Sequence, residues 1–134
     1  MNQDINRAAH AARTSLTVFG LYMMAIPGLG LMTVPGVLLD LFQLEHGEYF
    51  WMARVIGLLA FIIGVFQFCI ARFALAELYL ITVAQRYFAA LVFIALWIKG
   101  EAEIAIVLFA TLDMAGATWT LMAFKRSDSA LKNH

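Results

Sequence analysis

Charged residues and thiols are scarce in this chain of 134 residues. Only 13% of the residues carry charge, against about 25% in an ordinary soluble domain. The nine basic residues are balanced by nine acidic ones, so net charge gives no argument for nucleic-acid binding and none is predicted. A single cysteine, Cys69, excludes an internal disulfide and a paired-thiol redox centre within one chain.

Patterns that bind metals or cofactors are also missing. The three histidines, His10, His46 and His134, lie outside the long apolar stretches. Neither a haem held inside a helical bundle nor a di-iron carboxylate centre is therefore supported. The sequence also lacks a Gly-rich phosphate loop. We predict no catalytic residue, no metal and no cofactor, and at most a role as a subunit of a membrane oxidoreductase.

Apolar residues, by contrast, make up 63% of the chain, and the mean hydropathy is +0.85. A membrane-spanning helix needs roughly 20 mostly apolar residues. Four stretches meet this length, at 15–34, 53–72, 78–98 and 102–124. Because the later connections are short, neighbouring helices should run antiparallel. We predict one all-α integral membrane domain over residues 1–134, an antiparallel bundle of four transmembrane helices.

The distribution of basic residues predicts the orientation. With four spans, both termini and the middle loop share one side of the membrane. Six basic residues lie on that side, Arg54 and Lys99 lie on the other, and Arg86 lies within a span. By the positive-inside rule, both termini should be cytoplasmic. We expect the protein in a bacterial cytoplasmic membrane, also called the inner membrane.

Two segments outside these spans have helical character. Residues 4–13 are rich in Ala and place Arg7, His10 and Arg13 on one face, which suits either a short helix on anionic headgroups or a solubilising tail. Residues 35–43 are apolar and begin with a proline, the residue favoured at the first position of a helix. They predict a short interfacial helix after the first span.

Two charges fall at membrane depth. At 1.5 Å per residue, Arg86 lies about 12 Å from the cytoplasmic end of the third span and Asp113 about 16 Å from the outer end of the fourth. The third and fourth spans run antiparallel around a turn near Gly100, so two residues whose numbers add up to about 200 lie at the same depth. Arg86 and Asp113 should therefore meet. Because an isolated charge in hydrocarbon costs several kcal/mol, we predict an Arg86–Asp113 ion pair that fixes the bundle. Alternatively, the pair also contacts a ligand or moves protons.

Small residues at steps of three and four form stripes on the second and fourth spans. Such stripes let helices approach closely, and they would direct Gln67 toward Arg86 and Asp113. The stripe of the second span is Ala53, Gly57, Ala60, Gly64 and Gln67, that of the fourth is Ala110, Asp113, Gly116, Ala117 and Thr120, and Thr82, Gln85 and Tyr87 are alternative hydrogen-bond partners.

Two further features lie toward the outer side. Arg54 begins the second span, where it can reach the headgroups or pair with an acidic residue of the outer loops. In the first span, Pro27 removes a backbone donor beside Gly28 and Gly30. This segment is a candidate hinge or cavity wall, or a simple kink.

Short motifs in all four spans resemble those of the DoxX-like small four-helix membrane proteins. They are VPGVLLDLF after the first span, ARVIGLLAFIIG in the second, QRYFAALVF in the third and LDMAGATWT in the fourth. The resemblance covers most of the chain and implies Arg54, Arg86 and Asp113 as the positions carried over. Some members of that group are subunits of membrane oxidoreductases that work with quinones.

Two functions follow from these features. The first is a non-catalytic membrane protein, an oligomer-forming or accessory subunit of a membrane complex, surrounded by membrane lipids and fixed by the Arg86–Asp113 pair. The alternative is a binder or transporter of a small amphipathic or anionic ligand, such as a lipid or a quinone-like molecule. Its central polar cavity would be bounded by Gln67, Arg86, Asp113 and the first span.

Overall fold

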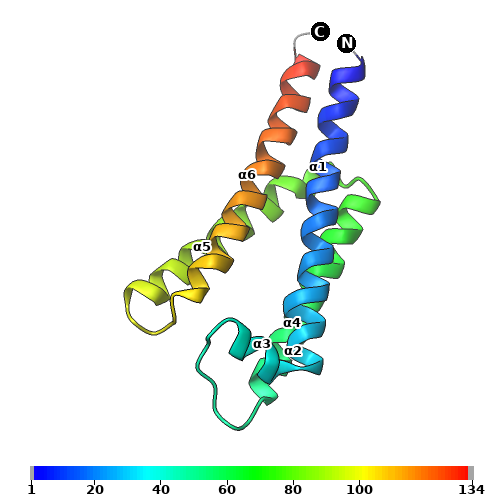
Figure 1. Ribbon diagram of the computed structural model, residues 1–134. Coiled ribbons are helices and arrows are strands. Elements are labelled where there is room, and N and C mark those ends of the chain that lie inside the picture. Colours follow the sequence, from blue (N-terminus) through cyan, green and yellow to red (C-terminus); the bar gives the residue numbers. More distant parts are fainter. Residues whose placement is uncertain (1, 133–134) are drawn as a thin grey trace.

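The structure is a computed structural model that describes residues 2–132. Within that range the regular elements are helices (Figure 1). They are α1 (Asn2–Met23), η1 (Met24–Leu29), α2 (Gly30–Thr33), α3 (Pro35–Leu41), α4 (Trp51–Arg72), η2 (Ala76–Leu78), α5 (Tyr79–Ile98) and α6 (Ala105–Lys132). Four helical stretches are long and apolar enough to cross a membrane: Asn6–Thr33, Trp51–Arg72, Ala76–Ile98 and Ala105–Arg126. The predicted all-α four-helix bundle is confirmed.

The first span differs from the prediction at its start. Residues 4–13 do not form a separate interfacial helix, because α1 runs without a break from Asn2 into the span. The segment is rich in Ala, the strongest helix former, and no proline occurs before Pro27. Near that proline the chain continues as a π-helical turn, η1, and then as α2. The wider turn keeps the span helical through the proline, whose ring would clash within a regular α-helix.

The segment between the first and second spans contains the predicted short helix. Helix α3 begins at Pro35, which occupies one of its first two positions. This is the place where a missing backbone donor costs least. Asp40 near its end and the loop that follows lie at the end of the bundle opposite the chain termini (Figure 1).

The helices pack in the order α4, α1, α6, α5. Helix α1 lies between α4 and α6, while α5 packs mainly on α6. The start of α1 and the end of α6 lie at one end of the bundle and extend past the turn that joins α4 to α5 (Figure 1). At the other end the α5–α6 pair diverges from the α1–α4 pair.

Glycines allow α1 and α4 to approach closely. A Cβ added to Gly64 would lie 2.7 Å from the carbonyl oxygen of Gly20, and one added to Gly57 would lie 2.9 Å from that of Gly28. On the other side of α1, the hydroxyls of Ser15 and Thr120 share a buried hydrogen bond of 2.6 Å. The small-residue stripes of the second and fourth spans therefore pack against the first span of the same chain.

Candidate intramembrane binding site

Arg86 on α5 is 2% exposed. Its guanidinium lies over the ring of Phe19 on α1, with Cζ 3.5 Å from the ring centroid. It also lies against the backbone of Gly116 on α6, where an added Cβ would overlap Nη2 and lie 2.9 Å from Cζ. Gly116 therefore leaves the room that the guanidinium occupies. Nε, Nη1 and Nη2 of Arg86 are all buried without a hydrogen-bond partner.

The predicted ion pair between Arg86 and Asp113 is not formed among the side chains that the structure describes. The two charges act on one another through space without contact. A helical side chain leans toward the N-terminus of its own helix, and α5 and α6 run in opposite directions. Arg86 therefore leans toward the end that holds the termini, and Asp113 leans away from it. Two positions at one level thus carry side chains that diverge.

Asp113 lies at a cavity of about 420 Å³ between the two diverging helix pairs. The cavity is bounded by the π-helical turn and its neighbours, by α3 and by α4, α5 and α6. Its lining residues are Tyr22, Met23, Ile26, Pro27, Leu31, Leu38, Leu39, Phe42, Leu44, Ala53, Ile56, Leu59, Ala60, Ile63, Phe93, Ile106, Phe109 and Asp113.

This lining is apolar except at one place. Among the described residues around the cavity, Asp113 is the only charged side chain, and Tyr22 supplies a hydroxyl near it. The central polar cavity expected from the sequence is therefore an apolar cavity with a single carboxyl group. Arg86 and Gln67 do not belong to its lining.

Gln67 lies inside the bundle, 2% exposed, with its Oε1 unpartnered. The alternative partners proposed for the buried polar groups are engaged elsewhere or exposed. The hydroxyl of Thr82 donates to the carbonyl of Tyr79, and that of Tyr87 shares a 2.6 Å hydrogen bond with Thr118. Gln85 is exposed. The polar groups of α4 and α5 thus do not form one network around Arg86.

Two other predicted positions lie beside the cavity. Arg54 is exposed and donates from Nη1 to the carbonyl of Met32, 3.2 Å away near the end of α2. Across the described side chains it has no acidic partner within ion-pair distance. Pro27 lines the cavity, and a Cβ on Gly28 would lie 3.1 Å from Cα of Phe61 on α4. The π-helical turn is therefore packed as a wall of the cavity.

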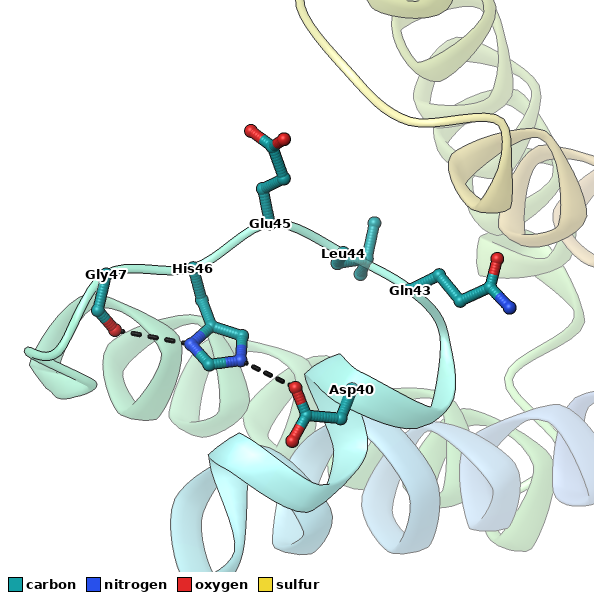
Figure 2. Close-up of a pocket in the computed structure, with 6 residues that line it drawn as sticks. All are labelled: Asp40, Gln43, Leu44, Glu45, His46 and Gly47. Atoms are coloured by element: carbon teal, nitrogen blue, oxygen red, sulfur yellow. Dashed lines mark hydrogen bonds and ion pairs between the residues drawn. The ribbon is translucent and has the colours of Figure 1, made fainter.

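A histidine and an aspartate tie the loop that follows α3 to that helix (Figure 2). Nε2 of His46 lies 2.9 Å from Oδ1 of Asp40, and Nδ1 lies 3.2 Å from the carbonyl oxygen of Gly47. Both ring nitrogens can donate to these oxygens only in the protonated ring. The bond to Asp40 and that to Gly47 raise the pKa of His46 above its usual 6.5. Leu44 in the same loop lines the cavity, so this contact holds a segment at the cavity edge.

The sequence alone did not identify Phe19, which contacts Arg86, or Tyr22, which lines the cavity. Phe19 and Tyr22 are aromatic residues within an apolar span, and nothing in their spacing distinguishes a partner of a charge from a lipid-facing ring. Their roles depend on the approach of α1 to α5 and α6. That approach is a long-range property of the fold.

No protein-family model, no curated protein and no solved structure matches this chain. The resemblance to the DoxX-like proteins stays a prediction. The fold and the site together define a class, a membrane protein of four spanning helices with an apolar cavity whose described lining carries one carboxyl group, that of Asp113.

Proposed function

We propose that this protein binds an amphipathic molecule of the bilayer in the cavity beside Asp113. The ligand has an apolar body and a head that is cationic or donates hydrogen bonds. The observation that carries the proposal is the cavity of about 420 Å³, whose described lining is apolar apart from Tyr22 and Asp113. Its volume falls in the range of about 300–1,000 Å³ that is typical of small-molecule sites.

The carboxyl group of Asp113 determines which heads are favoured. An ionised carboxylate only accepts hydrogen bonds, and the described lining contains no basic side chain. An anionic head would face a like charge in a medium of low dielectric, where repulsion is strong. Amines, quaternary ammonium groups and hydroxyls, including those of a quinol, satisfy the carboxylate, so of the ligands expected from the sequence the amphipathic class is favoured over the anionic one.

Arg86 supports this site without occupying it. Its charge interacts with Asp113 through space, while its guanidinium lies on Phe19 and Gly116. The oxygens of Asp113 accept no hydrogen bond from any side chain or backbone group that the structure describes. Arg86 therefore leaves the oxygens of Asp113 available to a ligand.

A role as an accessory or oligomer-forming subunit is the other prediction from the sequence. Its main support is the small-residue stripes, yet Gly57 and Gly64 contact the first span of the same chain. Ala117 and Thr120 are likewise fully buried within the chain. The stripes therefore supply no argument for a second copy, and the cavity favours ligand binding.

Thermal unfolding of the protein in lipid nanodiscs tests the proposal. Cys69 is the only cysteine and is half-buried, so a thiol-reactive dye reports unfolding at one position. The probes are decylamine, decanol and decanoate, which share a chain and differ in the head. Because a ligand that binds only the folded state stabilises it, we expect the Tm to rise with decylamine and decanol and to stay unchanged with decanoate.

Three variants connect this effect to the cavity. Ala53→Phe places a ring in the cavity lining, and Ala95→Phe places the same ring at an exposed position of α5 outside it. The stabilisation by decylamine should disappear in Ala53→Phe and persist in Ala95→Phe. In Asp113→Asn, decylamine should lose its advantage over decanoate. Equal shifts for all three probes, or the same shifts in Ala53→Phe, contradict the proposal.

A further inference from the structure

A second cavity lies between α1 and α6, toward the end of the bundle that holds the termini. Its volume is about 770 Å³, and it shares no lining residue with the cavity beside Asp113. On α1 its wall consists of small alanines, Ala8 and Ala11, and of Arg7. On α6 it is lined by the larger side chains of Trp119 and Met122. Small side chains on both helices, with Ala115 and Ala123 on α6, leave an open groove between them.

The chemistry of this groove changes along its length. Arg7 and Arg126 both lie in its lining, and each is at the end of a membrane span, since the spans are Asn6–Thr33 and Ala105–Arg126. Farther into the membrane the lining becomes apolar, with Trp119 and Met122 45% and 51% exposed. From Ala115 to Arg126 the helix rises about 16 Å at 1.5 Å per residue. Basic groups at the membrane edge are thus followed by an apolar wall toward the bilayer interior.

We propose that this groove is a binding site for an anionic phospholipid of the leaflet on the side of the termini. The phosphate lies between Arg7 and Arg126, and one acyl chain follows Trp119 and Met122 toward Ala115. The order of charge and apolar surface in the groove matches the order of headgroup and chain in such a lipid. Guanidinium groups bind phosphate oxygens with two parallel hydrogen bonds.

The composition of the groove favours an anionic lipid over the neutral lipids around it. Its lining contains two arginines, Arg7 and Arg126. A neutral zwitterionic headgroup would bring its own cation against these arginines. A free phosphate ion would use the basic end and leave the apolar wall uncovered. A lipid therefore fits this groove best, because it satisfies both the basic end and the apolar wall.

Fluorescence quenching by brominated lipids tests the site, because Trp119 is a native reporter in its wall. In a chain that keeps Trp119 alone, through Trp51→Phe and Trp97→Phe, the probe is phosphatidylglycerol with brominated acyl chains at a minor fraction in phosphatidylcholine vesicles. Brominated phosphatidylcholine at the same fraction gives the background. We expect phosphatidylglycerol to be enriched at Trp119 several-fold over its bulk fraction.

Charge variants separate the groove from general attraction to the membrane surface. A basic residue near an anionic surface contributes roughly a fivefold factor in affinity, so Arg7→Gln and Arg126→Gln should each lower the enrichment by about fivefold. Arg72→Gln is the matched control, because Arg72 is exposed at the end of α4 on the same side and does not line the groove. It should leave the enrichment unchanged.

A steric variant and a phosphate control complete the test. Ala115→Phe fills the apolar end of the groove and should lower quenching by both brominated lipids. Inorganic phosphate at millimolar concentration should not displace the lipid, and displacement would assign the basic end to a free ion. Equal quenching by the two lipids in the parent chain, or an equal loss in Arg72→Gln, overturns the proposal. Either result leaves the cavity beside Asp113 untouched, since the two sites share no residue.

Discussion

Replacing Arg86 by methionine should stabilise the fold. Methionine fills a similar elongated space without bringing charge or hydrogen-bond donors. In the structure the guanidinium is 2% exposed, its three nitrogens are unpartnered, and its contacts are the Phe19 ring and the backbone of Gly116. The variant removes an unsatisfied buried group and keeps most of the packing.

The size of the effect follows from these contacts. An unsatisfied buried donor costs about 1–3 kcal/mol. At the lower limit of this range, the three unpartnered nitrogens of Arg86 together destabilise the fold by about 3 kcal/mol. The cation–π contact with Phe19 at 3.5 Å offsets about 2 kcal/mol of this, as expected for a desolvated pair. We therefore expect the free energy of unfolding to rise by about 1 kcal/mol, and the Tm by about 3 °C for a chain of this size.

The assay is unfolding in nanodiscs followed at Cys69. Asp113→Ala provides the comparison, and it should cost little stability, because Arg86 has no direct bond to lose there. A strong loss of stability in both single variants, with a coupling of several kcal/mol in the double variant, would show that the two residues form a structural ion pair. That result would refute the reasoning.

Three further predictions test other parts of the structure. Gly116→Ala should destabilise the parent chain, because the added Cβ displaces the guanidinium of Arg86. In the Arg86→Met background the same substitution should be neutral or stabilising. Thermal unfolding of the parent chain, the two single variants and the double variant measures the difference. Gly64→Ala should cost about 1–3 kcal/mol by forcing α1 from α4, whereas Gly47→Ala, whose Cβ would meet nothing within 4 Å, should cost far less in the same assay. The pKa of His46 is raised in the fold, so its contact with Asp40 should stabilise the loop after α3 fully below pH 6.5. This contribution should be lost as the pH rises through the raised pKa. An NMR titration of the imidazole that finds a pKa at or below 6.5 would contradict this.

Hydropathy and local rules predict most of the fold. The spans follow from the apolar stretches, and the start of α3 follows from the position of Pro35. The position of the N-terminal segment cannot be predicted from its sequence, because an Ala-rich run forms a helix equally well on a membrane surface and as the continuation of a span. In the structure the segment continues into the span as part of α1, which packs on α6.

The sequence predicts the depth of Arg86 and Asp113 in the bundle but neither the contacts of their side chains nor the cavity. Counting from the turn near Gly100 places Arg86 and Asp113 near one level, yet the count does not include the direction in which each side chain leans. Antiparallel helices direct them toward opposite ends, and this difference separates a structural ion pair from a carboxyl group at a cavity. The cavity itself depends on the divergence of two helix pairs, which no local pattern encodes.

The most direct test of the account is a solid-state NMR distance between bound decylamine and Asp113. The measurement is the dipolar coupling between ¹⁵N in decylamine and the carboxyl ¹³C of labelled aspartate, with the Asp113→Asn chain as the subtraction. We predict a coupling that corresponds to about 3–4 Å, the separation expected for a charge-assisted hydrogen bond, and its loss in the variant. A bound amine with no coupling to Asp113, or with the same coupling in the variant, would contradict the central claim.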